Sequence, residues 1–353
     1  MKTNVSRIPH YILCVFTLAT GSAACAQSGY QVPRTSEGQP DLHGVWGNNT
    51  ITPVERPDIV EGREFLSAEE MQQLEGRVSE IESDSGAALF ADEVYIAALS
   101  GEINSNDPTT GNYDNSWLVE RSVGNRTSQI IDPSNGKYPP LSEEGIAERA
   151  RVAQIRNKNA ANGERFETLD SWLDLQTDDR CISNGAPYLD SGYNSYWQIV
   201  QSREYVVIVQ EMFHDARVIP LIDMPHVSEA IELWHGDSRG YWDGDTLVVE
   251  TRNYSDKHNR SVNTAELNVE RLTRIGDRQL RYLLTSHQPK TYTAPFTLEL
   301  IFDYADGAIF EVACHEGNYA MTNMLRGARE EERRERERLE SGNNNLVESS
   351  RSW

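Results

Sequence analysis

Nine short apolar runs follow one another between Trp197 and Glu316, and they constrain the fold more than any other feature of the chain. Each is rich in β-branched or aromatic residues, and turn sequences such as GDSRG, WDGD, IGDRQ and YADGA lie between them. The runs are WQIVQS, YVVIVQEM, ARVIPLI, EAIELW, DTLVVETRNY, LNVERLTRI, QLRYLLTSH, FTLELIFDY and AIFEVACHE. Strands that follow one another without intervening helices pair in antiparallel fashion. We therefore predict a mainly β fold, an antiparallel β-barrel or a strongly curved sheet.

Alternation assigns the faces of two of these runs. In FTLELIFDY every second residue from Phe296 to Tyr304 is large and apolar, so these residues share a core face. In AIFEVACHE the same rule places Phe310, Val312 and Cys314 on the core face and His315 on the opposite one. The pairs Asp243-Gly244 and Asp306-Gly307 predict hairpins, because a two-residue turn needs positive φ angles that such pairs tolerate.

The rest of the chain predicts an arm, two helices and a charged tail. Residues 27–66 are polar and rich in Pro and Gly apart from DLHGVW, which is typical of an extended arm. Ser67 and Glu70 form a capping box before an amphipathic helix, and Ser142 caps a second helix that ends before Gly163. The stretch NSNDPTTGN predicts a surface loop. The predicted regions are arm and amphipathic helix at 27–115, β-barrel domain with one inserted helix at 116–323, and helical or disordered tail at 324–353.

Residues 1–26 have the pattern of a secretory signal. Lys2 and Arg7 precede the apolar stretch YILCVFTLAT, which is too short to span a bilayer, and small residues follow as far as Ala26. A lipoprotein signal with Cys25 as the modified residue is the alternative. We therefore expect an exported protein, periplasmic or secreted.

The remaining chain is strongly acidic. Residues 27–353 carry 31 basic and 55 acidic side chains, a net charge of −24. Nucleic acid and anionic membrane surfaces are therefore unfavourable partners, and no later run is apolar enough to predict a transmembrane helix. The sequence leaves the oligomeric state open.

Export gives the cysteines a structural meaning. Cys181 and Cys314 remain once residues 1–26 are removed, and an oxidising compartment favours a disulfide between them. Two separate buried thiols are the alternative.

The segment EMFHDARVIPL places four ionisable groups directly after the apolar run YVVIVQ. They are Glu211, His214, Asp215 and Arg217. A regular strand would turn His214 away from the two carboxylates, whereas a bulge or bend near Phe213 and His214 would let them converge. His214 beside Asp215 then predicts a proton-transfer group, and Arg217 a stabiliser of negative charge. A structural Arg–carboxylate network is the alternative interpretation.

Two further clusters contain candidate ligand contacts. In WHGDSRGYWDGDTLVVET, Asp237, Arg239 and Trp242 lie in a sequence typical of a turn-rich loop, where binding groups are common but Asp is also an ordinary turn former. In ACHEGN, His315 and Glu316 follow the last predicted strand. A disulfide from Cys314 would bring an aromatic wall of Tyr193 and Trp197 to that strand end. We therefore count His315 with the catalytic candidates and Tyr193, Trp197, Asp237, Arg239, Trp242 and Glu316 with the substrate contacts.

Several site classes lack their sequence signatures. His214, His235, His315, Glu211 and Glu316 are the available metal-ligand types, but no H-E-x-x-H, paired-His or calcium-loop pattern occurs, so we predict no metal. No G-x-S-x-G elbow or Gly-rich phosphate loop occurs either, which disfavours an α/β-hydrolase and a nucleotide cofactor. We expect no cofactor.

Six motifs spread over residues 40–330 resemble a widespread family of exported bacterial proteins of unassigned function. They are DLHGVW, RTSQIIDPSNGKYPPLS, YNSYWQIVQ, EMFHDARVIPL, GDSRGYWDGDTLVVET and ACHEGNYAMTNMLRGAR. The resemblance supplies no catalytic residue. The β region also resembles lipocalin-like barrels, a likeness of fold that does not define function.

These observations lead to one functional expectation. We expect an enzyme, a lyase, isomerase or hydrolase, that does cofactor-independent acid–base chemistry on a small organic molecule or glycoside in the barrel mouth. A periplasmic ligand-binding protein without turnover is the alternative, and a structural envelope protein is a third class. Titratable groups inside the barrel would favour the enzyme, and an apolar interior with charges only at the rim would favour the binding protein.

Overall fold

The structure is a computed structural model that describes residues 30–83, 92–101, 121–161, 169–175, 177–255, 257 and 265–350. Residues 32–353 form one compact unit, distinct from residues 1–31. The expected signal segment at 1–26, the loop at 104–112 and Gly163 lie outside the described residues. Among the described helices, none has both the length and the apolar character needed to cross a membrane.

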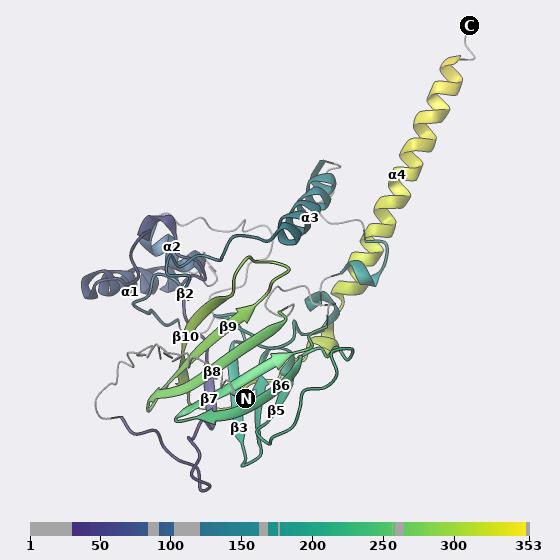
Figure 1. The fold of residues 1–353 in the computed structure, drawn as a ribbon. Helices are drawn as coiled ribbons and strands as arrows, with labels where there is room; N and C mark the ends of the chain where they lie inside the picture. The colour runs from purple at the N-terminus through teal and green to yellow at the C-terminus, as the bar shows by residue number, and fades with distance from the viewer. Residues whose placement is uncertain are drawn as a thin grey trace, which may run out of the picture. The chain divides into compact units, whose positions relative to one another are not determined.

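A ten-stranded antiparallel sheet forms the body of the protein (Figure 1). Its strands are β1 (Gly44–Gly47), β2 (Ile130–Asp132), β3 (Tyr196–Gln201), β4 (Tyr205–Gln210), β5 (Ala216–Pro220), β6 (Asp237–Asp243), β7 (Thr246–Arg252), β8 (Leu267–Gly276), β9 (Gln279–His287) and β10 (Phe296–Ala305). The hydrogen-bonded order is β5-β4-β3-β1-β10-β9-β8-β7-β6, and β2 also pairs with β10. The prediction of a mainly β antiparallel fold is confirmed.

The sheet is not closed into a barrel by hydrogen bonds, since β5 and β6 are its two edges. Each strand runs opposite to the next, so the two edges, eight strands apart, run in the same direction. They meet through side chains: a Cβ atom on Gly240 of β6 would lie 2.8 Å from Leu221 Cδ2 and 2.9 Å from Ile219 Cγ2. The antiparallel sheet of the prediction is present, but it is not closed, and the predicted barrel is not confirmed.

The predicted arm supplies a central strand. β1, from the motif DLHGVW, lies between β3 and β10 rather than over the main body. Gly44 permits this position, because a Cβ there would lie 2.5 Å from the ring of Tyr304. Trp46 is fully buried, with its ring edge-on to Tyr304 at a centroid distance of 5.3 Å.

Insertion of β1 explains why the last predicted strand is absent. β10 has β9 on one side and β1 on the other, so AIFEVACHE has no free edge of β10 to pair with. The run instead leads irregularly into a short 3-10 helix at Cys314–Gly317, and Phe310, predicted to be in the core, is 77% exposed. The hairpin predicted at Asp306-Gly307 is therefore also wrong.

The order of strand and turn between β5 and β7 also differs from the prediction. EAIELW is not a strand, because the side-chain amide of Asn253 donates to the carbonyls of Val227, Ser228 and Ile231 and holds this segment in an irregular path. DSRGYWD, predicted as a loop, is β6. The hairpin at Asp243-Gly244 is confirmed: Asp243 pairs with Thr246, and Gly244 has φ +62°.

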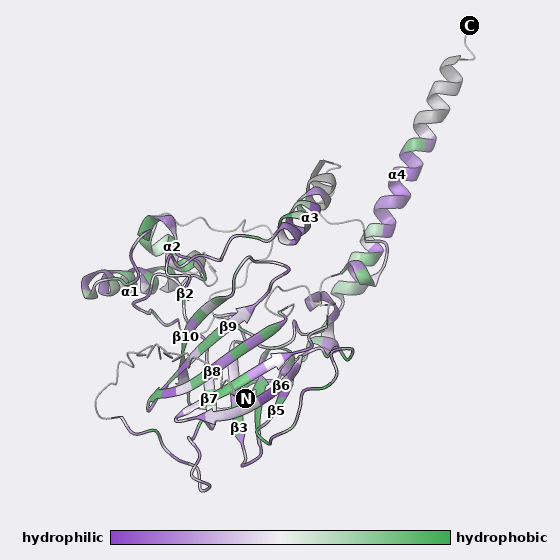
Figure 2. Ribbon diagram, viewed as in Figure 1, coloured by the Kyte–Doolittle hydropathy of each residue, from purple (hydrophilic) through white to green (hydrophobic). Residues whose placement is uncertain are grey.

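Four α-helices accompany the sheet. They are α1 (Ala68–Ser83), α2 (Asp92–Ser100), α3 (Glu143–Ala161) and α4 (Ala320–Ser350). The capping box is confirmed, since Glu70 N–H donates to Ser67 Oγ (3.2 Å) and Ser67 N–H to the Glu70 carboxylate (2.8 Å). Ser142 Oγ likewise accepts the N–H of Gly145 at the start of α3. α2 was not predicted; α4 agrees with the predicted charged tail, and Figure 2 shows its charged part as hydrophilic.

Short 3-10 helices complete the elements. They are η1 (Asp58–Val60), η4 (Trp172–Asp174), η5 (Asp178–Arg180), η6 (Met212–His214) and η8 (Cys314–Gly317). The core lies on the inner face of the sheet, and the predicted alternation of β10 is confirmed because Phe296, Leu298, Leu300 and Phe302 are all buried. A second apolar cluster joins α1 and α2 to Ile51, Val60 and Leu66.

Candidate functional site

The inner face of the sheet is polar at one end. One register row crosses β6, β7, β8 and β9 through Ser238, Thr251, Asn268 and Ser286, all buried. The next row, two residues away on each strand, contains Gly240, Val249, Glu270 and Leu284, and the row after that contains Trp242, Leu247, Leu272 and Tyr282. We call the first row, together with Glu270 and the residues bonded to it, the polar end.

A buried ion pair crosses the interior at this end. Arg217 of β5 makes two hydrogen bonds to Glu270 of β8, at 2.5 and 2.8 Å, and Tyr282 Oη donates to the same carboxylate at 2.9 Å. The curvature of the sheet brings β5 opposite β8, so side chains 53 positions apart meet. The bidentate geometry fits the fixed fork of a guanidinium.

The ion pair fixes the protonation of its neighbours. Burial alone would lower the pKa of Arg217, but the charge and hydrogen bonds of Glu270 outweigh it and raise that pKa above its usual value. Burial, followed by the charge of Glu270, raises the pKa of Tyr282 and that of Tyr254, which accepts a hydrogen bond from Asn268. Both phenols are therefore neutral hydroxyl groups at ordinary pH.

A His–Asp pair lies at the start of β6. His226 Nδ1 is 2.9 Å from Asp237 Oδ2, which also accepts the N–H of Val227, and Arg239 Nη1 donates to Asp237 Oδ1 at 2.7 Å. Burial would raise the pKa of Asp237, yet these hydrogen bonds and the charge of Arg239 outweigh it and hold that pKa below its usual value. Asp237 is therefore a carboxylate that orients the imidazole of His226.

A second His–Asp pair lies beside the first. His235 Nε2 is 3.5 Å from Asp215 Oδ2, an ion pair when His235 is protonated, and it joins the residue before β5 to the segment before β6. Gly236 separates His235 from Asp237 and has φ +69°. A Cβ on Gly236 would lie 2.8 Å from the carbonyl oxygen of Arg252, so glycine is required where the two pairs adjoin.

The four groups of EMFHDARVIPL do not converge. Residues 211–215 form the β4–β5 connection, in which Phe213 and His214 have φ +59° and +57°, so the chain does bend at the point that convergence would require. His214 is exposed in this connection. Buried Glu211 accepts the N–H of Phe310 at 2.9 Å and so ties the segment after β10 to the hairpin. Asp215 and Arg217 lie in the two separate arrangements described above.

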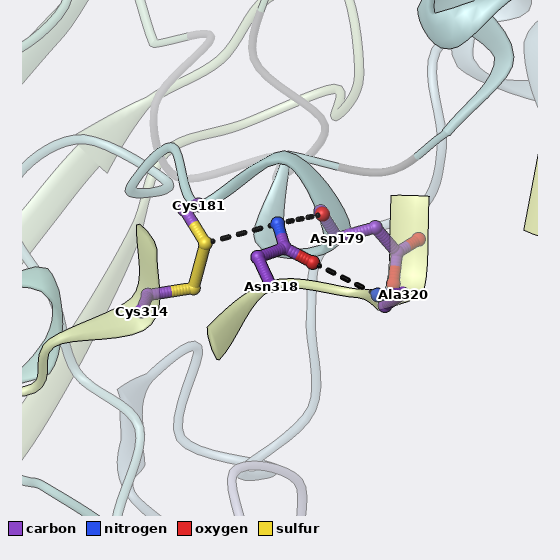
Figure 3. Close-up of a disulfide and its surroundings, with 5 residues drawn as sticks. All are labelled: Asp179, Cys181, Cys314, Asn318 and Ala320. Atoms are coloured by element: carbon purple, nitrogen blue, oxygen red, sulfur yellow. Dashed lines mark hydrogen bonds between the residues drawn. A yellow bond between two sulfur atoms is a disulfide. The ribbon is translucent and has the colours of Figure 1, made fainter. Parts of the chain in front are cut away.

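The third predicted cluster is divided between core and surface. The Cys181–Cys314 disulfide is present, with a Cα–Cα distance of 5.6 Å, and Asn318 joins it to Asp179 and Ala320 (Figure 3). His315 and Glu316 are exposed. Trp197 is a core residue whose Nε1–H donates to Tyr188 O, so it is not a surface substrate contact. Tyr193 and Trp242 are half-buried, and Trp242 packs against the core.

The sequence interpretation placed Asp237 and Arg239 in one loop cluster, whereas they are hydrogen-bonded neighbours on strand β6, and it did not identify His226 or Glu270. Glu270 was detectable as a charged residue at an inward position of a strand, although its partner depended on how the sheet curls. His226 follows Pro225 in a segment without periodicity, which contains no local signal.

Among the described residues, no group of three or more His, Cys, Asp and Glu side chains is arranged to hold a metal ion. Comparison with protein-family models finds no match, and comparison with curated proteins finds none either. The fold and the site therefore define the class of protein, a mainly β protein with an open antiparallel sheet and a polar inner end. The resemblance to exported bacterial proteins stays a prediction.

Proposed function

We propose that this protein is an enzyme that does acid–base chemistry without a cofactor, a lyase, isomerase or hydrolase, on a small organic molecule or glycoside. The observation that supports it is the 2.9 Å contact of His226 Nδ1 with an ionised, buried carboxylate. We assign the proton-transfer role to His226 instead of His214, which is exposed and has no such carboxylate contact described above.

The chemistry follows from the tautomer that Asp237 selects. A carboxylate beside Nδ1 stabilises the N–H at that position, so the lone pair of Nε2 accepts a proton from substrate and later returns it. Asp237 also stabilises the imidazolium formed in between. Arg239, bonded to Asp237 and to the carbonyl of Pro225 (2.8 Å), fixes the carboxylate.

We also propose that the chain is exported. The Cys181–Cys314 disulfide supports this, because such bonds persist in oxidising compartments.

A panel of chromogenic esters, glycosides and enolisable ketones tests the enzyme proposal. With any substrate found, we expect His226→Gln to lower kcat by about 10²–10⁴-fold, the usual contribution of a general acid–base group, with the fold retained. His214→Gln is the matched control, because His214 is exposed, and it should leave kcat unchanged. Equal activity of the His226→Gln variant and the wild type would refute the assignment.

The ligand-binding alternative has an observation of its own. Asp237 and Arg239 together bind Val227 N–H and the carbonyls of Met224 and Pro225, the contacts expected of a loop anchor. In that case His226→Gln lowers stability and leaves ligand affinity per folded molecule nearly unchanged. Measuring the melting temperature and ligand affinity of the same variant separates the two functions.

A further inference from the structure

Large apolar side chains are exposed in the connection between β5 and β6. In residues 222–233 they are Ile222, Met224, Ile231 and Leu233, with exposed fractions of 40%, 41%, 49% and 38%. Single exposed apolar residues are ordinary, whereas a group of them in one short segment marks a surface for a partner. We call the exposed face of residues 222–233 the connection surface.

Hydrogen bonds to the main chain hold this segment together. The side-chain amide of Asn253, the residue after β7, donates to the carbonyl of Ile231 (3.2 Å), and the Asn253 carbonyl accepts the N–H of Leu233 (2.8 Å). The same amide donates to the carbonyl of Val227 (3.3 Å), three residues after Met224. Both halves of the segment therefore meet at Asn253, so the apolar side chains stay close together and exposed in the folded protein.

Exposed carboxylates lie between the apolar side chains of the connection surface. They belong to Asp223, Glu229 and Glu232, and Asp223 and Glu232 each lie between two of the apolar residues in the sequence. Within the part of the chain that the structure describes, none of the three has an ion-pair partner. Such a surface is complementary to a partner that supplies positive charges and apolar side chains together.

We propose that the connection surface binds a basic amphipathic segment of a partner protein, in which lysine or arginine lies beside leucine-like side chains. The four apolar residues pack against the apolar face of that segment, and the three carboxylates pair with its cations. This binding role is separate from the proposed function, because it requires no proton transfer by His226.

The charges disfavour the other occupants of an apolar surface. A second copy of the chain would bring like charges together, since residues 27–353 carry 31 basic and 55 acidic side chains and the connection surface adds three carboxylates on each copy. An anionic membrane surface repels the same carboxylates. A cationic partner gains from them.

Isothermal titration calorimetry of the protein tests the proposal with a designed peptide as the probe. The probe is the leucine–lysine peptide LKKLLKLLKKLLKL, which is amphipathic as a helix. One control peptide has glutamate in place of each lysine, and the other has serine in place of each leucine. We expect saturable binding of the leucine–lysine peptide and at least about tenfold weaker binding of both controls.

A pair of double variants tests the apolar contacts. Ile231→Ser with Leu233→Ser should weaken binding of the leucine–lysine peptide by about fivefold or more, because two apolar contacts are lost. Ile96→Ser with Ile146→Ser is the matched control, since these side chains are similarly exposed, at 45% and 57%, on α2 and α3. The control should leave affinity unchanged.

A second pair tests the charges. Glu229→Gln with Glu232→Gln should also weaken binding by about fivefold or more, because the lysines lose their partners. Glu69→Gln with Glu75→Gln removes the same two charges from exposed positions of α1 and should leave affinity nearly unchanged. This control separates contact at the connection surface from the general attraction of a cationic peptide to an acidic protein.

Amide NMR of the ¹⁵N-labelled wild type gives a second measurement that needs no variant to fold. Saturating leucine–lysine peptide should shift the signals of residues 222–233, and shifts confined to other residues would overturn the proposal. Equal affinity of the two double variants in either pair would also overturn it. So would dimerisation, or binding to vesicles of anionic phospholipid, that depends on Ile231 and Leu233.

Discussion

Arg217 and Glu270 place opposite charges where the sheet buries both side chains almost completely. Removing two charges from water costs several kcal/mol for each, and the bidentate contact with the added bond from Tyr282 offsets that cost. A buried pair of this kind specifies how the strands are arranged more than it stabilises them. We infer that it fixes the position of β5 opposite β8.

Replacing only one residue of the Arg217–Glu270 pair should lower the free energy of unfolding far more than replacing both residues with apolar ones. We expect Glu270→Gln to lower the free energy of unfolding by about 3–5 kcal/mol, because Arg217 is left buried without a counter-charge. The double variant Arg217→Met, Glu270→Leu should recover most of that loss. Urea unfolding of the wild type, Glu270→Gln and the double variant measures both effects.

Glu250→Gln of β7 is the control, since Glu250 forms a long ion pair of 3.9 Å with Arg252 and both side chains are partly exposed. It should change the free energy of unfolding by less than about 0.5 kcal/mol. A double variant as unstable as Glu270→Gln alone would contradict our view of the pair.

The lowered pKa of Asp237 predicts a contribution to the free energy of unfolding that depends on pH. Because the folded pKa lies below the usual value near 3.9, the contribution is complete above about pH 4 and is lost as the pH falls through the folded pKa. The difference in free energy of unfolding between wild type and Asp237→Asn should therefore be constant near neutrality and shrink in acid. A difference that stays constant to the acid end of the titration would show that Asp237 is not ionised through these contacts.

Residue types were more predictable than residue partners. Arg217 and Asp237 were identifiable as groups needing partners, because each lies beside an apolar run. Glu270 and His226 were not assignable to them, since the first partnership depends on sheet curvature and the second on a segment without periodicity.

At the scale of elements, Gly236 sets the position of both His–Asp pairs. We expect Gly236→Ala to cost more than Gly244→Ala, although both glycines have a similar positive φ. At Gly244 a Cβ meets nothing within 4 Å, so only the backbone penalty of about 1–2 kcal/mol applies, whereas at Gly236 it meets the carbonyl of Arg252 and Thr251. Thermal unfolding of the two variants measures the difference, and equal losses would contradict the packing.

The sequence predicted an element well where that element depends only on residues close to one another in the chain. The capping box at Ser67, the alternation of β10 and the hairpin at Asp243 all depend on residues close in sequence. AIFEVACHE was wrongly predicted because strand formation requires a free edge, and β1, from more than 250 residues away, occupies it. β1 itself is only four residues long and too short for a periodicity signal.

At the scale of the whole molecule, the disulfide joins the segment before β3 to the segment after β10. Cys181 and Cys314 are separated by 133 positions, so the bond closes a long loop of the unfolded chain. We expect Cys181→Ala with Cys314→Ala to lower the free energy of unfolding by about 3–5 kcal/mol. Urea unfolding gives the value, and intact mass after alkylation with and without reduction checks the bond. Two alkylated thiols in the unreduced protein would contradict it.

The central claim is that Asp237 fixes His226 as a base, and the ¹⁵N chemical shifts of the His226 ring test it without a substrate. In the neutral imidazole we predict the proton on Nδ1 and none on Nε2, with this preference lost in Asp237→Asn. A ring that is protonated at Nε2 in the wild type, or a tautomer unchanged by Asp237→Asn, would contradict the account.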